Sequence, residues 1–403
     1  MMGCEAPHHC ALKKMPKEIT HCILAERAAH TMAASANSRK KAVGQEIYFL
    51  FEKHPELLYF GSISPDIFFY DIKLPWEFGV KHRGLVWGDV IHGTDGENTL
   101  KHVFGMLHIL QSAELQQQLT PGRALTHEEK NALTLFVLGY LTHVALDTVM
   151  HPLVYYFSGN YYAHEYRERL RAEARHRAIE TVLDLYNLAS INSDLKQYRA
   201  MKKMALPKKW RDLVLSLYTL ALRRAWPELT ERQFGNVAAK TAREHPLFTV
   251  ALRGYKKEIL FNRIFQNPRL ARLGLWYNKK KHDALHAHSS LLYPAQSYHE
   301  YRDLDNDNQL LSFAALKTYR DPVDDREKNV NAQHLTKKAI ARSHAFFRAA
   351  WLYAQGHITE DAAARTLKGY SLNHGRLNTR TDAMRHFNPI PVNGNFELTR
   401  DTP

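Results

Sequence analysis

Long apolar runs, cysteines and alternating strand patterns are all scarce in this chain. No apolar run reaches about 18 residues, the length at which a helix spans a bilayer, so the sequence argues against a membrane-spanning segment. The three cysteines, Cys4, Cys10 and Cys22, lie near the N-terminus and cannot supply a disulfide framework for 403 residues. We therefore expect a soluble, reduced protein made mainly of helices.

The N-terminus lacks the apolar core and the small-residue cleavage site of a secretory signal peptide. This absence favours a cytoplasmic protein. The cysteines and histidines from Cys4 to Cys10 could bind a metal adventitiously, but residues 1–14 have no hydrophobic periodicity, and we expect them to form a disordered tail. Met15 is an alternative to Met1 as the native start.

The composition is that of a globular protein with a basic surface. Hydrophobic residues make up 45% of the chain, which is enough to bury a large core. Lysine and arginine number 55 against 41 aspartates and glutamates, which gives a formal charge of +14. A charge of this sign favours anionic partners such as phospholipid headgroups or nucleic acid.

Helical periodicity dominates the chain, with apolar residues recurring at spacings of three and four positions. Segments rich in proline and glycine separate these stretches, so we predict an all-α fold of antiparallel helices. The predicted helices cover residues 42–53, 99–117, 128–156, 164–188, 210–226, 234–265 and 333–353. The polar stretches 304–308 and 320–328 are expected to be surface loops.

The character of the chain changes near residues 190–203. The helices before this point are rich in histidine and acidic residues, and those after it are rich in lysine, arginine and aromatics. We predict a metal-binding domain over residues 15–190 and a C-terminal helical region of unknown function over residues 191–403. Within that region, the histidines at 282–288 are expected on a surface loop, and residues 370–387 could close over a cleft.

The most specific motif is His143, Asp147 and His151, which are spaced by four residues in one predicted helix. Each step of four residues turns about 40° around the helix axis, so the three side chains share one stripe. The apolar run before His143 predicts burial, where unpaired polar groups are costly and metal ligation would satisfy them. Nitrogen and oxygen ligands of this kind are those that zinc prefers.

A second pair, His176 and Glu180, has the same spacing in the next predicted helix. Antiparallel packing of the two helices would bring all five ligands to one cleft, as in bundle metal sites. Because the chain has 24 histidines, some matches of this kind arise by chance. An exposed polar stripe explains His176 and Glu180 about as well as a metal site does.

Three further residues are candidates that no single motif establishes. Asp66 follows Pro65 in a turn between aromatic and aliphatic residues, where it could instead cap a helix. His21 lies in an apolar-periodic helix, where a lone histidine is more often a packing residue. His92 lies at a glycine-rich bend that leaves it free to turn inward.

Taken in chain order, these residues resemble the zinc-dependent phospholipase C family. The family has an N-terminal histidine, a Gly-x-x-x-Pro-Asp turn, a mid-chain histidine, a His-x3-Asp helix and a His-x3-Glu helix. The matching features here are His21, Gly61 to Asp66, His92, His143 with Asp147, and His176 with Glu180. The resemblance covers roughly residues 16–185 and is far more specific than any one motif.

The resemblance implies a zinc-dependent phospholipase C/nuclease-like helical bundle, here with additional C-terminal helices. The family includes fungal single-strand nucleases and the N-terminal domain of glycosylphosphatidylinositol-specific phospholipase D. Secreted members also use an N-terminal tryptophan as a zinc ligand, whereas this chain has no tryptophan before Trp76. The short gap from Asp147 to the next histidine resembles the phospholipase D branch.

The same resemblance implies two or three zinc ions. By analogy with the family, the ligand sets are Asp66, His92, His143 and Asp147 for one zinc, His151, His176 and Glu180 for a second, and Asp147 with His21 for a third. Our hypothesis is phosphodiester hydrolysis, most plausibly of phospholipids, by a metal-activated hydroxide. Asp66 is the predicted catalytic carboxylate, which orients the water or takes its proton. Ligand spacing does not choose between C-type and D-type cleavage.

Two alternatives to a phospholipase stay open at this point. One is a single-strand nuclease on the same metal centre, favoured by the positive charge and by aromatics that could stack on bases. The other is a non-catalytic module that keeps zinc only for stability. A group of four basic residues beside two tryptophans could also contact an anionic membrane surface, although solvated helix faces explain this pattern equally well. That group is Lys208, Lys209, Trp210, Arg223, Arg224 and Trp226.

Overall fold

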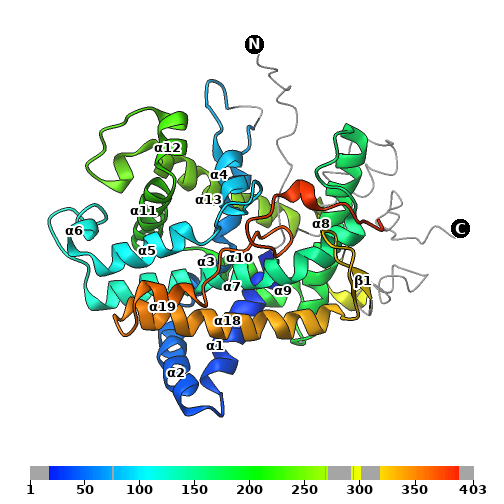
Figure 1. Ribbon diagram of the computed structural model, residues 1–403, viewed down its shortest axis with the longest axis horizontal. Helices are drawn as coiled ribbons and strands as arrows, with labels where there is room; N and C mark the ends of the chain where they lie inside the picture. The colour runs from blue at the N-terminus through cyan, green and yellow to red at the C-terminus, as the bar shows by residue number, and fades with distance from the viewer. Residues whose placement is uncertain are drawn as a thin grey trace, which may run out of the picture.

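Figure 1 shows the fold as a computed structural model, which describes residues 18–74, 77–267, 269–270, 292–293, 295–300 and 318–389. The regular structure of the described part is helical apart from one antiparallel pair of two-residue strands, so the all-α prediction is confirmed. The predicted N-terminal tail, the loop at 304–308 and the histidines at 282–288 lie outside the described residues.

The helices of the first half lie between Glu18 and Ala189. They are α1 (Glu18–Ala33), α2 (Ser38–Lys53), α3 (Pro55–Ile63), the 3₁₀ helix η1 (Ser64–Tyr70), α4 (Gly84–Ile91), α5 (Lys101–Gln111), α6 (Ala113–Gln116), α7 (His127–Ser158) and α8 (Tyr166–Ala189). The second half contains α9 (Leu195–Tyr198), α10 (Ala200–Met204), α11 (Lys208–Ala225), α12 (Pro227–Phe234), η2 (Ala242–Glu244), α13 (Pro246–Phe265), β1 (Tyr319–Arg320), β2 (Glu327–Lys328), α18 (Ala332–Ala354), α19 (Glu360–Ala364) and η3 (Thr381–Ala383).

Two predicted helices are broken in the structure. The helix predicted at 234–265 begins only at Pro246, because Gly235, with a φ of 73°, ends α12 and the chain then runs through η2. Ser112 has an extended backbone that ends α5, and its side chain caps α6 by accepting from the Leu115 N–H at 3.3 Å. The predicted loop at 320–328 contains the short pair β1–β2 and buries Asp321.

Helix α7 is the central element, and it packs against α3 on one side and α18 on another (Figure 1). It begins with a capping box between Thr126 and Glu129 and ends at Gly159, whose φ of 95° breaks the helix. By length and composition α7 could cross a membrane, but its most apolar 18-residue window is 100% buried inside the protein. It is therefore packed as a core helix.

Two glycines allow α3 and α7 to cross at very short range. A Cβ on Gly61 would lie 2.3 Å from the Phe136 carbonyl oxygen, and a Cβ on Gly139 would lie 2.3 Å from the Leu58 carbonyl oxygen. No other residue fits at either position without moving a backbone. The crossing places the end of α3, and η1 after it, beside the histidine-bearing half of α7.

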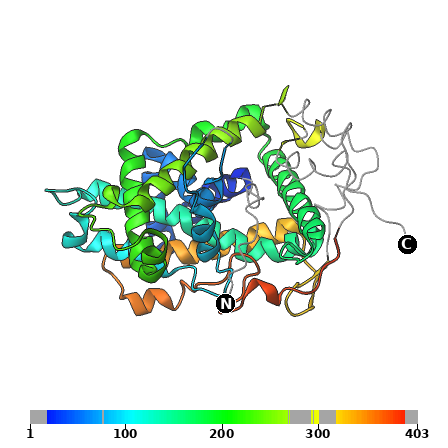
Figure 2. The ribbon, with the colours of Figure 1, turned by 90° about the horizontal axis from the view of Figure 1, so that it is seen from above.

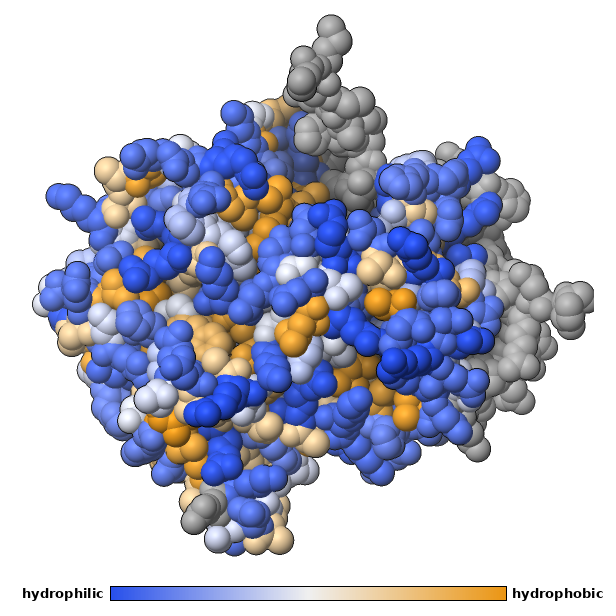
Figure 3. All heavy atoms as spheres, in the orientation of Figure 1, coloured by the Kyte–Doolittle hydropathy of each residue, from blue (hydrophilic) through white to orange (hydrophobic). Residues whose placement is uncertain are grey.

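One hydrophobic core contains residues from both predicted regions. Phe60 and Phe136 from the first region share it with Leu217 and Phe347 from the second. The boundary predicted near residue 190 stays a prediction. Seen from above in Figure 2, the red C-terminal segment lies along one edge of the bundle, next to the orange helices α18 and α19. Figure 3 shows a largely hydrophilic face with apolar residues in separate patches, as expected when most apolar side chains are internal.

Candidate metal centre

All eight predicted metal-binding residues are buried, with exposed fractions from 0% for His143 to 9% for Glu180. They come from five parts of the chain: α1, η1, the residue after α4, α7 and α8. In order they are His21, Asp66, His92, His143, Asp147, His151, His176 and Glu180. The structure brings all of them into one connected array, which is formed by the contacts described below.

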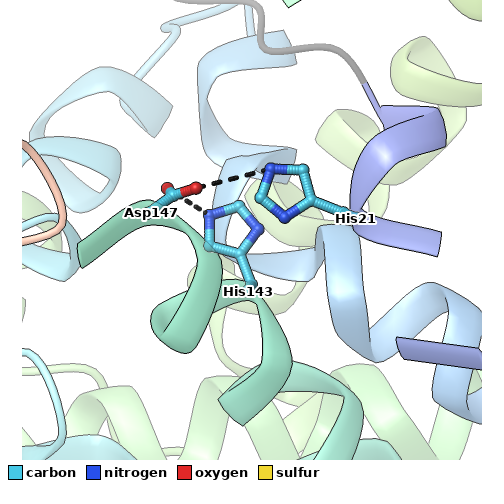
Figure 4. Close-up of side chains that lie close together, drawn as sticks. All are labelled: His21, His143 and Asp147. Atoms are coloured by element: carbon cyan, nitrogen blue, oxygen red, sulfur yellow. Dashed lines mark ion pairs between the residues drawn. The ribbon is translucent and has the colours of Figure 1, made fainter. Parts of the chain in front are cut away.

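The first group joins α1 to α7 and is drawn in Figure 4. His143 Nε2 lies 2.9 Å from one oxygen of Asp147, and His21 Nε2 lies 3.4 Å from the other. The rings of His21 and His143 are stacked, with centroids 4.1 Å apart. Asp147 therefore faces two imidazoles at once, as a bridging carboxylate would.

The second group joins η1 and the end of α4 to the same histidine of α7. His92 Nε2 lies 3.1 Å from one oxygen of Asp66, and His143 Nε2 lies 3.6 Å from the other. His143 therefore belongs to both groups.

The third group lies between α7 and α8. His176 Nε2 and His151 Nε2 lie 3.2 Å and 3.6 Å from the same oxygen of Glu180. His151 Nδ1 lies 3.7 Å from Asp147, which links this group to the first. Within each of the three groups the donor atoms lie within 4.8 Å of one another, close enough to share one metal ion.

The turn from α3 into η1 explains how Asp66 and His143 meet. In the 3₁₀ pattern the Ser62 carbonyl would accept from residue 65, but Pro65 has no N–H to donate. The Ser62 carbonyl oxygen instead accepts from His143 Nδ1 at 2.9 Å. In the Gly-x-x-x-Pro-Asp turn, Gly61 thus permits the close crossing, Pro65 leaves a carbonyl for His143, and Asp66 supplies the carboxylate.

Asp71 fixes the loop that joins η1 to α4, and so the relative positions of Asp66 and His92. Its buried carboxylate accepts from the backbone N–H groups of Arg83 and Gly84 at 3.0 Å each, and from Arg253 Nη2 at 2.9 Å. The arginine comes from α13, so a helix of the second half braces the site.

Backbone carbonyls fix the tautomer of three histidines in the array. His92 Nδ1 lies 2.8 Å from the Gly88 oxygen, His143 Nδ1 lies 2.9 Å from that of Ser62, and His151 Nδ1 lies 2.7 Å from that of Leu372. Since a carbonyl oxygen only accepts, Nδ1 carries the proton in each ring. In a neutral ring Nε2 then has a free lone pair, which is the arrangement that metal-binding histidines use.

In the absence of a metal ion, the carboxylates of the array stabilise positive charge on neighbouring histidines. Burial opposes the imidazolium of His143, but Asp147 and Asp66 outweigh it and raise its pKa to about 9. Burial likewise disfavours the Glu180 carboxylate, yet His176 and His151 lower its pKa to about 2. His21 differs, because burial and the neighbouring His143 lower its pKa to about 4. The array is thus a buried anionic site that attracts cations.

The residues fit zinc. Their donors are imidazole nitrogens and carboxylate oxygens, which zinc binds at about 2.0 to 2.2 Å. Glu180 Oε2 is buried and has no hydrogen-bond partner among the described residues, which is costly unless a cation lies beside it. The number of ions bound, and the ligand role of each residue, stay predictions.

A small cavity of about 40 Å³ opens on the array. Its walls combine residues of the second and third groups with aromatic side chains and two further polar groups: Asp66, Phe69, His92, His151, Tyr155, Tyr161, His176, Arg177, Glu180 and Asn373. Sequence reasoning did not single out Arg177, and it named Asn373 only as part of the segment 370–387 that could close over a cleft. The sequence could have indicated Arg177, because it lies between His176 and Glu180 on one helix. Nothing in the sequence marks Asn373 beyond its place in the segment 370–387, and the structure puts that residue beside the array.

The sequence model of the family described as zinc dependent phospholipase C matches residues 20–228. The match covers more than half of the chain and extends past the range that the motifs had suggested. The protein therefore belongs to the zinc-dependent phospholipase C family, a family of hydrolases. No curated protein and no solved structure matches the chain.

Proposed function

We propose that this protein is a zinc-dependent phosphodiesterase that hydrolyses phospholipids by C-type or D-type cleavage. The observation that carries the proposal is the buried array, in which His143 joins the first ligand group to the second and Asp147 joins the first to the third, within the fold of this family. A zinc site kept only for stability is usually a closed shell of four ligands. Adjoining groups that border a cavity are more typical of catalysis.

The residues around the cavity have different chemical roles. Zinc, when bound, supplies Lewis acidity that lowers the pKa of a water and stabilises negative charge on the phosphoryl oxygens. Asp66 lines the cavity, and its carboxylate lies beside His92 and His143, so it is placed to orient that water or to accept its proton. Phe69, Tyr155 and Tyr161 supply apolar walls that limit access of bulk water.

The size of the cavity limits what enters it. A volume of about 40 Å³ holds only a few water-sized groups, since one water needs about 10 to 15 Å³ on this measure. The acyl chains of a lipid would therefore stay outside, and only the phosphodiester would approach the array.

The basic residues of α11 support membrane contact by their charge, and the two tryptophans beside them do not contribute. Trp210 is only 7% exposed, and Trp226 packs against His102 with centroids 5.4 Å apart, so neither is placed to enter a lipid interface. Lys208 and Arg224 are exposed. We propose a salt-sensitive contact with anionic lipid, and a cytoplasmic location stays a prediction.

The test is hydrolysis of purified phospholipids by the zinc-loaded protein and by Asp66→Asn, with products identified by mass spectrometry. Diacylglycerol identifies C-type cleavage and phosphatidic acid identifies D-type cleavage. Asp95→Asn is the matched control, because Asp95 is an exposed carboxylate three residues after His92. We expect Asp66→Asn to lose activity by about 100-fold or more, as for loss of a positioned acid or base.

Single-stranded DNA is the comparison substrate, because the charge of +14 favours a nuclease as the second candidate. Cleavage of DNA with intact phospholipid would replace the proposal by that alternative. A normally folded Asp66→Asn variant with full hydrolytic activity would remove Asp66 from the mechanism.

A further inference from the structure

A C-terminal loop, residues 371–376, bonds directly to the ligand array, although it lies outside the region that matches the family. The Leu372 N–H donates to the His92 carbonyl oxygen at 3.0 Å. The Leu372 carbonyl oxygen accepts from His151 Nδ1 at 2.7 Å. A single residue of the loop therefore contacts one histidine from the second ligand group and one from the third.

The next residue, Asn373, repeats this connection through its side chain, which is only 3% exposed. Its Nδ2 donates to the His92 carbonyl oxygen at 3.3 Å. Its Oδ1 accepts from the hydroxyls of Tyr155 and Tyr162 at 3.0 Å and 3.1 Å. The Tyr155 ring in turn contacts the ring of His176 edge-on, with centroids 4.8 Å apart. The amide is thus held between the two ligand groups.

The loop has a fixed shape where it meets α7. The Gly375 N–H closes the turn by donating to the Ser371 carbonyl oxygen at 2.8 Å. Gly375 has a φ of 69°, and a Cβ there would lie 2.2 Å from the Thr148 carbonyl oxygen. Only glycine meets both requirements, and the loop therefore packs directly on the α7 backbone beside His151.

An ion-pair cluster anchors the same loop to the β1–β2 turn. Arg376 Nη2 lies 2.8 Å from Asp321 and 2.6 Å from Asp324. Asp321 is only 5% exposed. The acidic stretch at 320–328, expected from the sequence to be a surface loop, thus holds the loop against the array.

We infer that residues 371–373 are part of the metal centre, where they fix the backbone of His92, the ring orientation of His151 and the spacing between the second and third ligand groups. Asn373 is the positioning residue. The inference rests on the proposed zinc centre. The Leu372 carbonyl is the partner of the His151 ring, and Asn373 holds the loop that presents it. Loss of such a ring partner typically changes metal affinity by about 10- to 100-fold.

The experiment measures zinc affinity by competition with a chromophoric chelator, together with the absorption spectrum of the cobalt-substituted protein. It compares the full-length chain with Asn373→Ala, which removes the amide, and Arg376→Gln, which removes the anchor. Arg380→Gln is the matched control. Arg380 follows in the same segment but is 61% exposed and pairs with Asp95 and Asp382, away from the array.

We expect Asn373→Ala to bind at least one zinc about 10- to 100-fold more weakly and to change the cobalt spectrum, which reports ligand geometry. Arg376→Gln should shift both readouts in the same direction, and Arg380→Gln should match the wild type. Arg376 touches no ligand residue, so it carries the test if Asn373→Ala does not fold.

Wild-type zinc affinity and an unchanged cobalt spectrum in both loop variants would overturn the inference and leave the zinc centre intact. A wild-type chain that binds zinc no better than Asp147→Asn would overturn the centre itself, and the role of the loop with it.

Discussion

The close crossing of α3 and α7 makes Gly139→Ala a sharp test of the packing that positions His143. The added Cβ would lie 2.3 Å from the Leu58 carbonyl oxygen and 2.9 Å from the Gly61 Cα, so the helices must separate by about 1 Å to restore normal contact. Overpacking of this kind costs about 1 to 3 kcal/mol, and because backbone atoms on both sides resist the shift we expect the upper end, about 3 kcal/mol. Alanine regains about 1 kcal/mol as a better helix former, so we expect a net destabilisation of about 2 kcal/mol.

Gly105→Ala is the matched control, because a Cβ at Gly105 would meet Ala221 at an ordinary 3.5 Å. Without a clash, only the helix preference remains, and we expect stabilisation by about 0.5 to 1 kcal/mol. Urea unfolding followed by circular dichroism gives both values. Gly139→Ala should also weaken zinc binding, since His143 lies one turn further along α7. Equal stability of Gly139→Ala and wild type would refute the close crossing.

Three further perturbations probe separate parts of the account. Asp71→Ala should destabilise the protein by about 3 to 5 kcal/mol in urea unfolding, because it leaves the Arg253 guanidinium without its buried carboxylate partner; a loss below 1 kcal/mol would refute that role. Hydrogen bonds from Arg123 lower the pKa of Glu129 to about 2, so the ionised carboxylate stabilises the fold above its unfolded pKa of about 4.3. The stability lost in Glu129→Gln should therefore shrink as the pH falls from about 4.3 toward 2, and a difference independent of pH would contradict this assignment. Chelation of zinc should lower the melting temperature of the wild type. If free zinc had been 100 times its Kd, the free energy of unfolding falls by about 2.7 kcal/mol, and the melting temperature of Asp147→Asn should fall less.

Ligands on one helix could be predicted from the sequence because their geometry is local. His143, Asp147 and His151 share a stripe of α7 whatever packs around them, and the same holds for His176 and Glu180 on α8. The order of the five motifs then indicated that Asp66 would join them. The distances between groups required the crossing of α3 and α7, which spacing in the sequence does not specify.

Helix ends were predicted less well than helix positions. The apolar period continues through 234–265, yet Gly235 and Pro246 interrupt the helix between them. Ser112 likewise splits the segment predicted at 99–117, because its side chain satisfies the first N–H groups of α6. In both cases local capping and backbone preference override hydrophobic periodicity.

The carbonyl partners of the histidines could not be predicted at all. Leu372 lies 221 residues from His151 along the chain, and a backbone carbonyl leaves no side-chain signature. Asn373 and Arg376 are ordinary polar residues in sequence, and only the packed fold shows that one holds the array and the other holds the loop.

The most direct test of the central claim is the zinc content per chain, measured by elemental analysis on tag-free protein purified without added metal or chelator. The wild type should carry two or three zinc ions, and Asp147→Asn should carry fewer because Asp147 joins the first group to the third. Zinc absent from both proteins, with the helical fold intact by circular dichroism, would contradict the account and leave the family architecture without its metal chemistry.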